Sequence, residues 1–128
     1  MSYITYTDIT KELLDSISPG DMIKVNDWKQ PLKVIAVSDN YFLMVRNMFG
    51  KILYSVCEKK KSDYTHNRRK VGQFTCGKDW WLFGWNCDGF HIDNPQWCKD
   101  YLNSFETGES GLSRSSIAIE QIRIGKAK

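Results

Sequence analysis

The sequence is poor in the features that mark membrane-spanning and exported proteins. No apolar run in its 128 residues approaches the roughly 20 residues that a membrane-spanning helix needs. Residues 1–15 have neither the basic start nor the apolar stretch of a secretory signal. We therefore expect a cytoplasmic protein with no membrane partner.

Catalytic motifs are also missing. The sequence has no Gly-x-Ser-x-Gly nucleophile elbow and no His-Glu-x-x-His metal motif. Residues 72–79 approach the phosphate-binding pattern G-x4-G-K-S/T, but Asp79 replaces the hydroxyl that binds magnesium and would repel phosphate. Residues 80–85, which follow, are typical of a strand, whereas the motif needs a helix. We expect no enzymatic activity and no cofactor, with a Cys87–His91 dyad as the catalytic alternative.

Cysteine is scarce and never forms a C-x-x-C pair. Four cysteines without an export signal predict free thiols in a reducing compartment, several of them buried as small apolar side chains. Zinc binding by Cys76, Cys87, His91 and Cys98 is the alternative, although their spacing lacks the close ligand pairs of structural zinc sites. The cysteines therefore favour packing over metal binding.

Aromatic residues, in contrast, are plentiful. Five Trp, six Tyr and six Phe make up 13% of the chain, beside 26% charged residues. A disordered chain buries too little apolar surface to offset its conformational entropy. The high aromatic content of this chain therefore excludes a disordered protein. We expect residues 1–128 to form a single domain.

Charges are segregated along the chain although the net charge is only +3. Residues 51–70 hold seven basic and two acidic residues, a net of +5, and residues 79–109 hold one basic and six acidic residues, a net of −5. Residues 58–72 lack apolar periodicity, which predicts a long, exposed basic loop within the domain. Mutual neutralisation of the two segments and anion binding by the basic one both explain the pattern.

Hydrophobic periodicity predicts an α+β fold. Apolar residues at helical spacing predict a short N-terminal helix over residues 8–17, capped by Thr7, and a second helix near residues 95–106. Asp93 or Asn94 would cap the second helix. Together with the strands, the helices fit a small, curved antiparallel sheet or an SH3-like open barrel. The strands are expected at residues 22–25, 32–37, 41–46, 52–57, 73–76, 80–85 and 117–124.

Aromatic and basic residues interleave along these strands and turns. Aromatic rings stack on bases, and lysine and arginine bind phosphate, so this mixture favours a ligand that has both. Trp28 lies in a polar turn, where it either folds back onto the sheet or contacts a partner. In the basic loop, residues 59–61 and 68–70 are the candidate anion contacts, with a solvated loop as the alternative. The candidate ligand-binding residues are Trp28, Lys29, Tyr41, Arg46, Tyr54, Arg68, Arg69 and Trp80.

Short segments spread over most of residues 20–115 form a further pattern. They are residues 20–21, 25–32, 38–41, 53–57, 76–79 and 105–110. This pattern resembles that of small accessory or anti-defence proteins of phages and mobile elements. The resemblance implies a protein that acts by binding, since small products of this kind often block host immune proteins or sequester nucleotide signals.

We therefore predict a non-enzymatic binding protein that counters host immunity by sequestering an anionic, nucleotide-like ligand. Two alternatives stay open. One is an inhibitor that binds a host defence protein, such as a nuclease complex, through Trp28 and the charged loop. The other is a small barrel that binds nucleic acid directly, with an affinity that falls steeply with salt. Homo-oligomerisation is compatible with all three.

Overall fold

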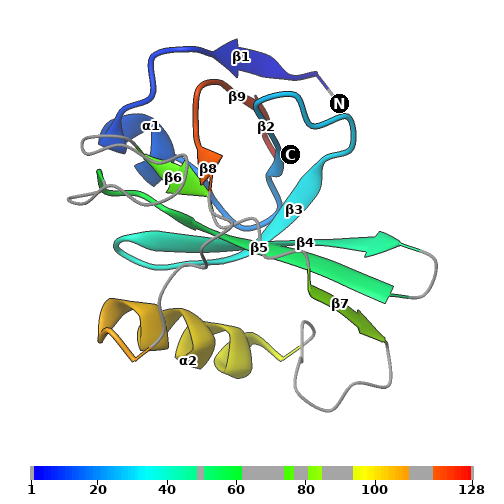
Figure 1. Cartoon of the computed structure of the whole chain (residues 1–128), viewed down its shortest axis with the longest axis vertical. Helices are drawn as coiled ribbons and strands as arrows, with labels where there is room; N and C mark the ends of the chain where they lie inside the picture. Colours follow the sequence, from blue (N-terminus) through cyan, green and yellow to red (C-terminus); the bar gives the residue numbers. More distant parts are fainter. Residues whose placement is uncertain are drawn as a thin grey trace.

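The elements are arranged as a curled sheet with one helix on each side, as a computed structural model shows (Figure 1). The structure describes residues 2–48, 51–61, 74–76, 81–84, 94–109 and 117–127. In chain order, the elements in these residues are β1 (Ile4–Tyr6), α1 (Lys11–Asp15), β2 (Met22–Val25), β3 (Leu32–Val37), β4 (Tyr41–Met48), β5 (Lys51–Glu58), β6 (Thr75–Cys76), β7 (Trp81–Gly84), α2 (Pro95–Glu106), β8 (Ile117–Ala118) and β9 (Ile122–Gly125).

The strands pair antiparallel in the order β1-β9-β2-β3-β4-β5-β6-β8, and β7 pairs with the first half of β5. β8 pairs with β6 near one end of this order, whereas β9 pairs with β2 and β1 near the other. Only residues 119–121 separate β8 from β9, so this bent segment draws the two ends of the sheet together. The result is a small open barrel, which confirms the predicted α+β class and the curved antiparallel sheet.

β2, β3, β4 and β5 pair in chain order as an antiparallel meander. β2 and β3 have the expected bounds, and β4 and β5 pair from Tyr41 with Glu58 to Met48 with Lys51. The strands expected over residues 41–46 and 52–57 are therefore longer in the structure and include Asn47, Met48 and Lys51, because pairing extends the backbone ladder through them.

The sheet is buried on both faces along β4. Alternate residues of a strand point to opposite faces, and Phe42 and Met44 accordingly belong to a core inside the barrel, whereas Leu43 and Val45 belong to a second core beneath α2. All four side chains are buried, which explains the unbroken apolar run in this strand. Two separate cores therefore share one strand.

A β-bulge in β3 fits the strand to both cores. The register with β4 shifts between Val34 and Ala36. Val34 packs inside the barrel, and the next two residues, Ile35 and Ala36, both pack against the core beneath α2. A bulge bends and twists its strand locally, which contributes to the curl of the sheet.

The second helix matches its prediction and the first does not. In α2, Asn94 is the N-cap and its Oδ1 accepts a hydrogen bond from Trp97 N at 3.1 Å, with Pro95 in the first turn. α1 is shorter than the predicted helix over residues 8–17 and is capped by Thr10, whose Oγ1 accepts from Leu13 N at 3.1 Å. The predicted cap at Thr7 is wrong because β1 ends just before it and the chain must turn through the residues that follow.

Two further differences concern strands. β1 was not predicted, and the single strand expected over residues 117–124 is divided into β8 and β9. Lys59 was expected in an exposed loop but is only 4% exposed; residues 62–72 of that loop lie outside the described residues. In the part of the chain that the structure describes, no helix is long and apolar enough to cross a membrane.

Candidate anion-binding site

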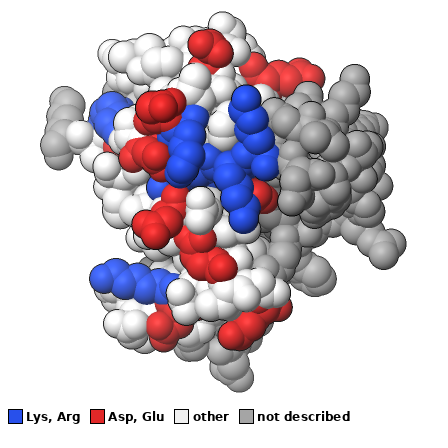
Figure 2. All heavy atoms as spheres, turned by 90° about the vertical axis from the view of Figure 1, so that its left-hand side faces the viewer, with Lys and Arg blue, Asp and Glu red and all other residues white. Residues whose placement is uncertain are grey.

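A pocket of about 470 Å³ lies beside α1, next to the residues that follow β5. Figure 2 shows basic side chains gathered on this side of the molecule, with acidic side chains around them. The pocket is lined by Asp8, Ile9, Thr10, Lys11, Glu12, Lys60, Lys61 and Phe74.

The lining of this lysine pocket carries a small excess of positive charge. Its residues include three lysines, Lys11, Lys60 and Lys61, and two acidic residues, which leaves one positive charge. Nζ of Lys60 lies 5.9 Å from the centroid of the Tyr41 ring. Nζ of Lys61 lies 5.9 Å from the centroid of the Phe74 ring, at the outer range of a cation–π contact. A phosphate group in the pocket would therefore meet lysine ammonium groups beside an aromatic ring.

Lys59 anchors the chain that carries the two lysines after it. Its backbone N donates to Asn40 O at 2.7 Å, and its Nζ donates to Ser38 O at 2.8 Å. Burial lowers the pKa of Lys59, and the nearby carboxylate of Asp15, 3.7 Å from Nζ, partly offsets this. Because its side chain is buried, Lys59 serves to position the pocket and does not reach a ligand in it.

Lys11 is held at the pocket by weaker contacts. Its Nζ lies 3.2 Å from Oδ1 of Asp15, one helical turn away, and 3.3 Å from the backbone O of Asp39. Both partners of the ion pair are about half exposed, and such surface pairs contribute only about 0–1 kcal/mol. Lys11 can therefore exchange Asp15 for an anionic ligand at small cost.

Helix α2 also holds the β3–β4 turn, whose residues Ser38 and Asn40 bond Lys59. The Glu106 carboxylate accepts hydrogen bonds from Ser38 Oγ, Asn40 N and Asn40 Nδ2, each at 2.8 Å. Burial alone would raise the pKa of Glu106, but these hydrogen bonds outweigh it and lower the pKa. The turn that receives Lys59 is thus held by an ionised side chain from another element.

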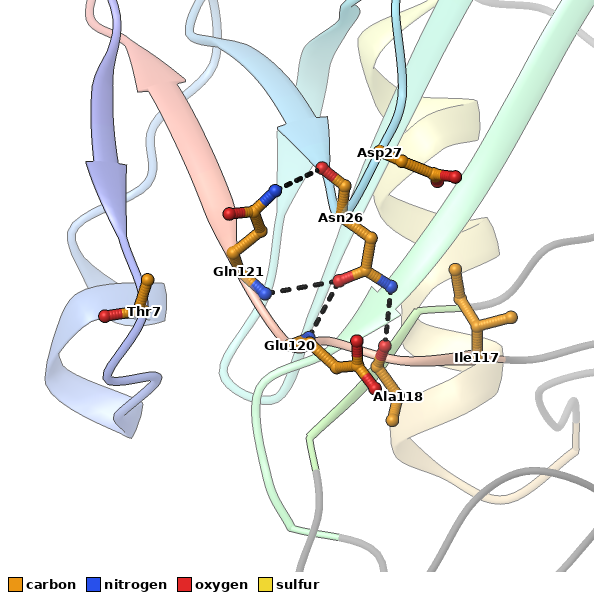
Figure 3. Close-up of a pocket in the computed structure, with 7 residues that line it drawn as sticks. All are labelled: Thr7, Asn26, Asp27, Ile117, Ala118, Glu120 and Gln121. Carbon is orange, nitrogen blue, oxygen red and sulfur yellow. Dashed lines mark hydrogen bonds between the residues drawn. The ribbon is translucent and has the colours of Figure 1, made fainter.

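A second pocket, of about 570 Å³, lies where the turn after β2 meets the segment between β8 and β9 (Figure 3). Asn26 joins these parts: its Oδ1 accepts from Glu120 N at 2.8 Å and Gln121 N at 3.2 Å, and its Nδ2 donates to Ala118 O at 2.9 Å. The lining of this Asn26 pocket comprises Thr7, Asn26, Asp27, Ile117, Ala118, Glu120 and Gln121.

Comparison of the chain with family models, curated proteins and solved structures gives no match. The function must therefore be argued from the two pockets themselves.

The described residues among the predicted ligand contacts do not all lie at one site. Trp28 is 9% exposed and packs in the barrel core, which is the inward of its two expected orientations. Tyr41 and Tyr54 are buried in the other core, beneath α2. Lys29 is exposed after the β2–β3 turn, and Arg46 is half-buried on β4. Arg68, Arg69 and Trp80 lie outside the described residues.

The cysteines that the structure describes are packing residues. Cys57 and Cys76 are register partners on β5 and β6, and both are fully buried in the barrel core. Burial and a hydrogen bond with Cys76 raise the pKa of Cys57, so it is a poor nucleophile. Cys98 lies in the core beneath α2, on the other side of the sheet, so Cys76 and Cys98 do not meet at one zinc site. Cys87 and His91 lie outside the described residues.

Part of the lysine pocket was visible in the sequence. The run of lysines at residues 59–61 was among the expected anion contacts, and Lys60 and Lys61 do line the pocket. Lys11 and Phe74 were not expected, because only the folded chain brings them to those lysines. In the described ranges, no group of three or more His, Cys, Asp or Glu residues could hold a metal ion.

Proposed function

We propose that the protein is a non-enzymatic binding protein that captures an anionic, nucleotide-like ligand in the lysine pocket. The observation that carries this proposal is that Lys11, Lys60 and Lys61 line one pocket beside the ring of Phe74. Its volume of about 470 Å³ is within the range of small-molecule sites. Lysine ammonium groups bind phosphate as point charges.

The proposal includes a biological setting and an architecture. The setting is a phage-type protein in the cytoplasm of a host cell, where capture of a nucleotide signal would counter host immunity. Sequestration needs affinity and no chemical step, which suits the buried Cys57 thiol, whose pKa is raised. The architecture is an SH3-like barrel, for which the β2–β5 meander and the bent β8–β9 segment are the support.

Isothermal titration calorimetry with nucleotides tests this function. The panel contains nucleoside mono-, di- and triphosphates and cyclic dinucleotides, and the variant is the double substitution Lys60→Ala, Lys61→Ala. Loss of two ammonium contacts should weaken binding at least tenfold. Lys99→Ala is the matched control, because Lys99 is exposed on α2 and does not line the pocket.

The outcomes separate this function from its alternatives. If no nucleotide binds, or if Lys99→Ala weakens binding as much as the double variant, the proposed function is wrong. Binding of DNA or RNA, with an affinity that falls steeply with salt and without nucleotide binding, would favour a nucleic-acid-binding barrel instead. Recovery of one stoichiometric host protein without nucleotide binding would favour a protein inhibitor.

A further inference from the structure

The two pockets have no lining residue in common, but their linings are adjacent along the chain. Thr7 lines the Asn26 pocket and Asp8 lines the lysine pocket, and the Cα atoms of consecutive residues are about 3.8 Å apart. On another side, Phe74 of the lysine pocket accepts a hydrogen bond through its backbone O from Ile119 N at 2.8 Å. Ile119 follows Ala118 of the Asn26 pocket directly. The pockets are therefore neighbours across both the β1–α1 connection and the β6–β8 pair.

The lining of the Asn26 pocket differs from that of the lysine pocket in its chemistry. Asp27 and Glu120 are exposed carboxylates, and neither has an ion-pair partner among the residues that the structure describes. Ionised carboxylates only accept hydrogen bonds. Ile117 and Ala118 add half-buried apolar surface. A phosphate group would be repelled here, whereas a group rich in hydrogen-bond donors would be accepted.

The side-chain amide of Asn26 and Nε2 of Gln121 are already bonded to the protein. The Asn26 side chain bonds Ala118 O, Glu120 N and Gln121 N, and Nε2 of Gln121 donates to Asn26 O at 2.9 Å (Figure 3). This bonding holds the walls in place and leaves the two carboxylates to contact a ligand. The pocket is thus a frame held by hydrogen bonds, and its lining includes two carboxylate acceptors.

We infer that one ligand occupies both pockets, with its phosphates in the lysine pocket and its nucleoside in the Asn26 pocket. The inference rests on the proposed function and names the part of the ligand that the lysines do not explain. Ribose hydroxyls and the amino groups of bases donate hydrogen bonds to carboxylates, and a base ring has apolar faces for Ile117 and Ala118. The chemical class is therefore a phosphorylated nucleoside and not a simple polyphosphate.

Calorimetry with a nucleoside triphosphate and with inorganic tripolyphosphate tests the inference, because the two share the triphosphate chain and differ in the nucleoside. The wild-type protein should bind the nucleotide at least tenfold more tightly. In the double variant Asp27→Asn, Glu120→Gln, this preference should fall to within about threefold, while tripolyphosphate binds as before or better because two negative charges are gone. The double variant Lys60→Ala, Lys61→Ala should weaken both ligands.

A control variant tests whether the nucleotide preference depends on these two carboxylates. Glu109→Gln removes one exposed carboxylate that lies in neither pocket lining and should leave the nucleotide preference unchanged. Equal affinity of the wild-type protein for the two ligands overturns this inference and leaves the proposed function standing. A nucleotide preference that survives Asp27→Asn, Glu120→Gln also overturns it. Failure of every nucleotide and of tripolyphosphate to bind overturns the proposed function and the inference together.

Discussion

Asn26 joins two parts of the chain that are far apart in sequence. Its backbone has a φ of 52°, in the left-handed region, and its side chain satisfies three backbone groups of residues 118–121. Asparagine tolerates this backbone conformation better than most residues and bonds locally from it. At the bend between β8 and β9, the Asn26 side chain thus bonds three backbone groups, while Ile119 N donates to the backbone O of Phe74.

Two substitutions separate the roles of Asn26. Asn26→Gly keeps the left-handed backbone and loses the three hydrogen bonds, so the free energy of unfolding should fall by about 1–3 kcal/mol. Asn26→Ala also strains the backbone by about 1–2 kcal/mol, partly offset by the greater freedom of glycine in the unfolded chain. Urea denaturation should therefore rank alanine below glycine. Unchanged stability of the glycine variant would contradict the bonding role.

Helix α2 forms a layer of its own over the outer face of the sheet. Leu102 is 1% exposed and lies in the core that this helix forms with β3, β4 and β5. The Trp97 and Tyr101 rings stack on the same helix, with centroids 5.2 Å apart. The helix adds Glu106 as a clamp on the β3–β4 turn. It therefore both covers the sheet and orders the turn behind the lysine pocket.

Truncation of Leu102 tests the energetic weight of this layer. Leu102→Ala removes a fully buried side chain and should lower the free energy of unfolding by about 2–5 kcal/mol, depending on how far the site collapses. The matched control is Asn103→Ala, next along the helix and exposed, which should change stability by less than about 0.5 kcal/mol. Chemical denaturation of both variants measures the difference. Equal losses would show that α2 is not packed as described.

The accuracy of the sequence predictions depended on how local the signals were. α2 was predicted because its cap, its first-turn proline and its apolar face lie within residues 94–105. β1 was missed because it has only three residues and pairs with β9, which lies more than a hundred residues further along the chain. Lys11 was missed at the site for the same reason, whereas Lys60 and Lys61 belonged to a basic run visible in the sequence.

At the scale of the whole molecule, the barrel and its covering helix have different tasks. The α2 side is a structural layer in which Tyr41 and Tyr54 are buried, although the sequence suggested them as ligand contacts. Both pockets instead adjoin the segment from Thr7 to Glu12, at the α1 side of the barrel. The proposed binding pockets and the layer formed by α2 therefore adjoin different parts of the sheet.

Two carboxylates join separate parts of the chain: Asp21 bonds the C-terminal segment, and Glu106 bonds helix α2 to the β3–β4 turn. Asp21 is 1% exposed and accepts hydrogen bonds from Ser18 N at 2.9 Å, Lys126 Nζ at 2.7 Å and Ala127 N at 2.9 Å. Burial would raise the pKa of Asp21, but these contacts outweigh it and lower the pKa. The pKa of Glu106 is lowered in the same way. Both groups therefore favour folding only while they are ionised.

Acid should accordingly destabilise the molecule through these two groups. A carboxyl whose pKa is lowered by folding contributes its full stability above its ordinary value, 3.8 for Asp21 and 4.5 for Glu106, and loses it as the pH falls through the lowered value. We expect Asp21→Asn to lower the free energy of unfolding by about 1–3 kcal/mol at pH 7, and its stability to converge with that of the wild type as the pH falls below 4. Urea denaturation from pH 7 to pH 3 measures both curves. The control is Asp100→Asn, which replaces an exposed carboxylate on α2; its free energy of unfolding should change with pH as that of the wild type does. A difference between the wild type and Asp21→Asn that stays constant with pH would contradict the role of ionised Asp21.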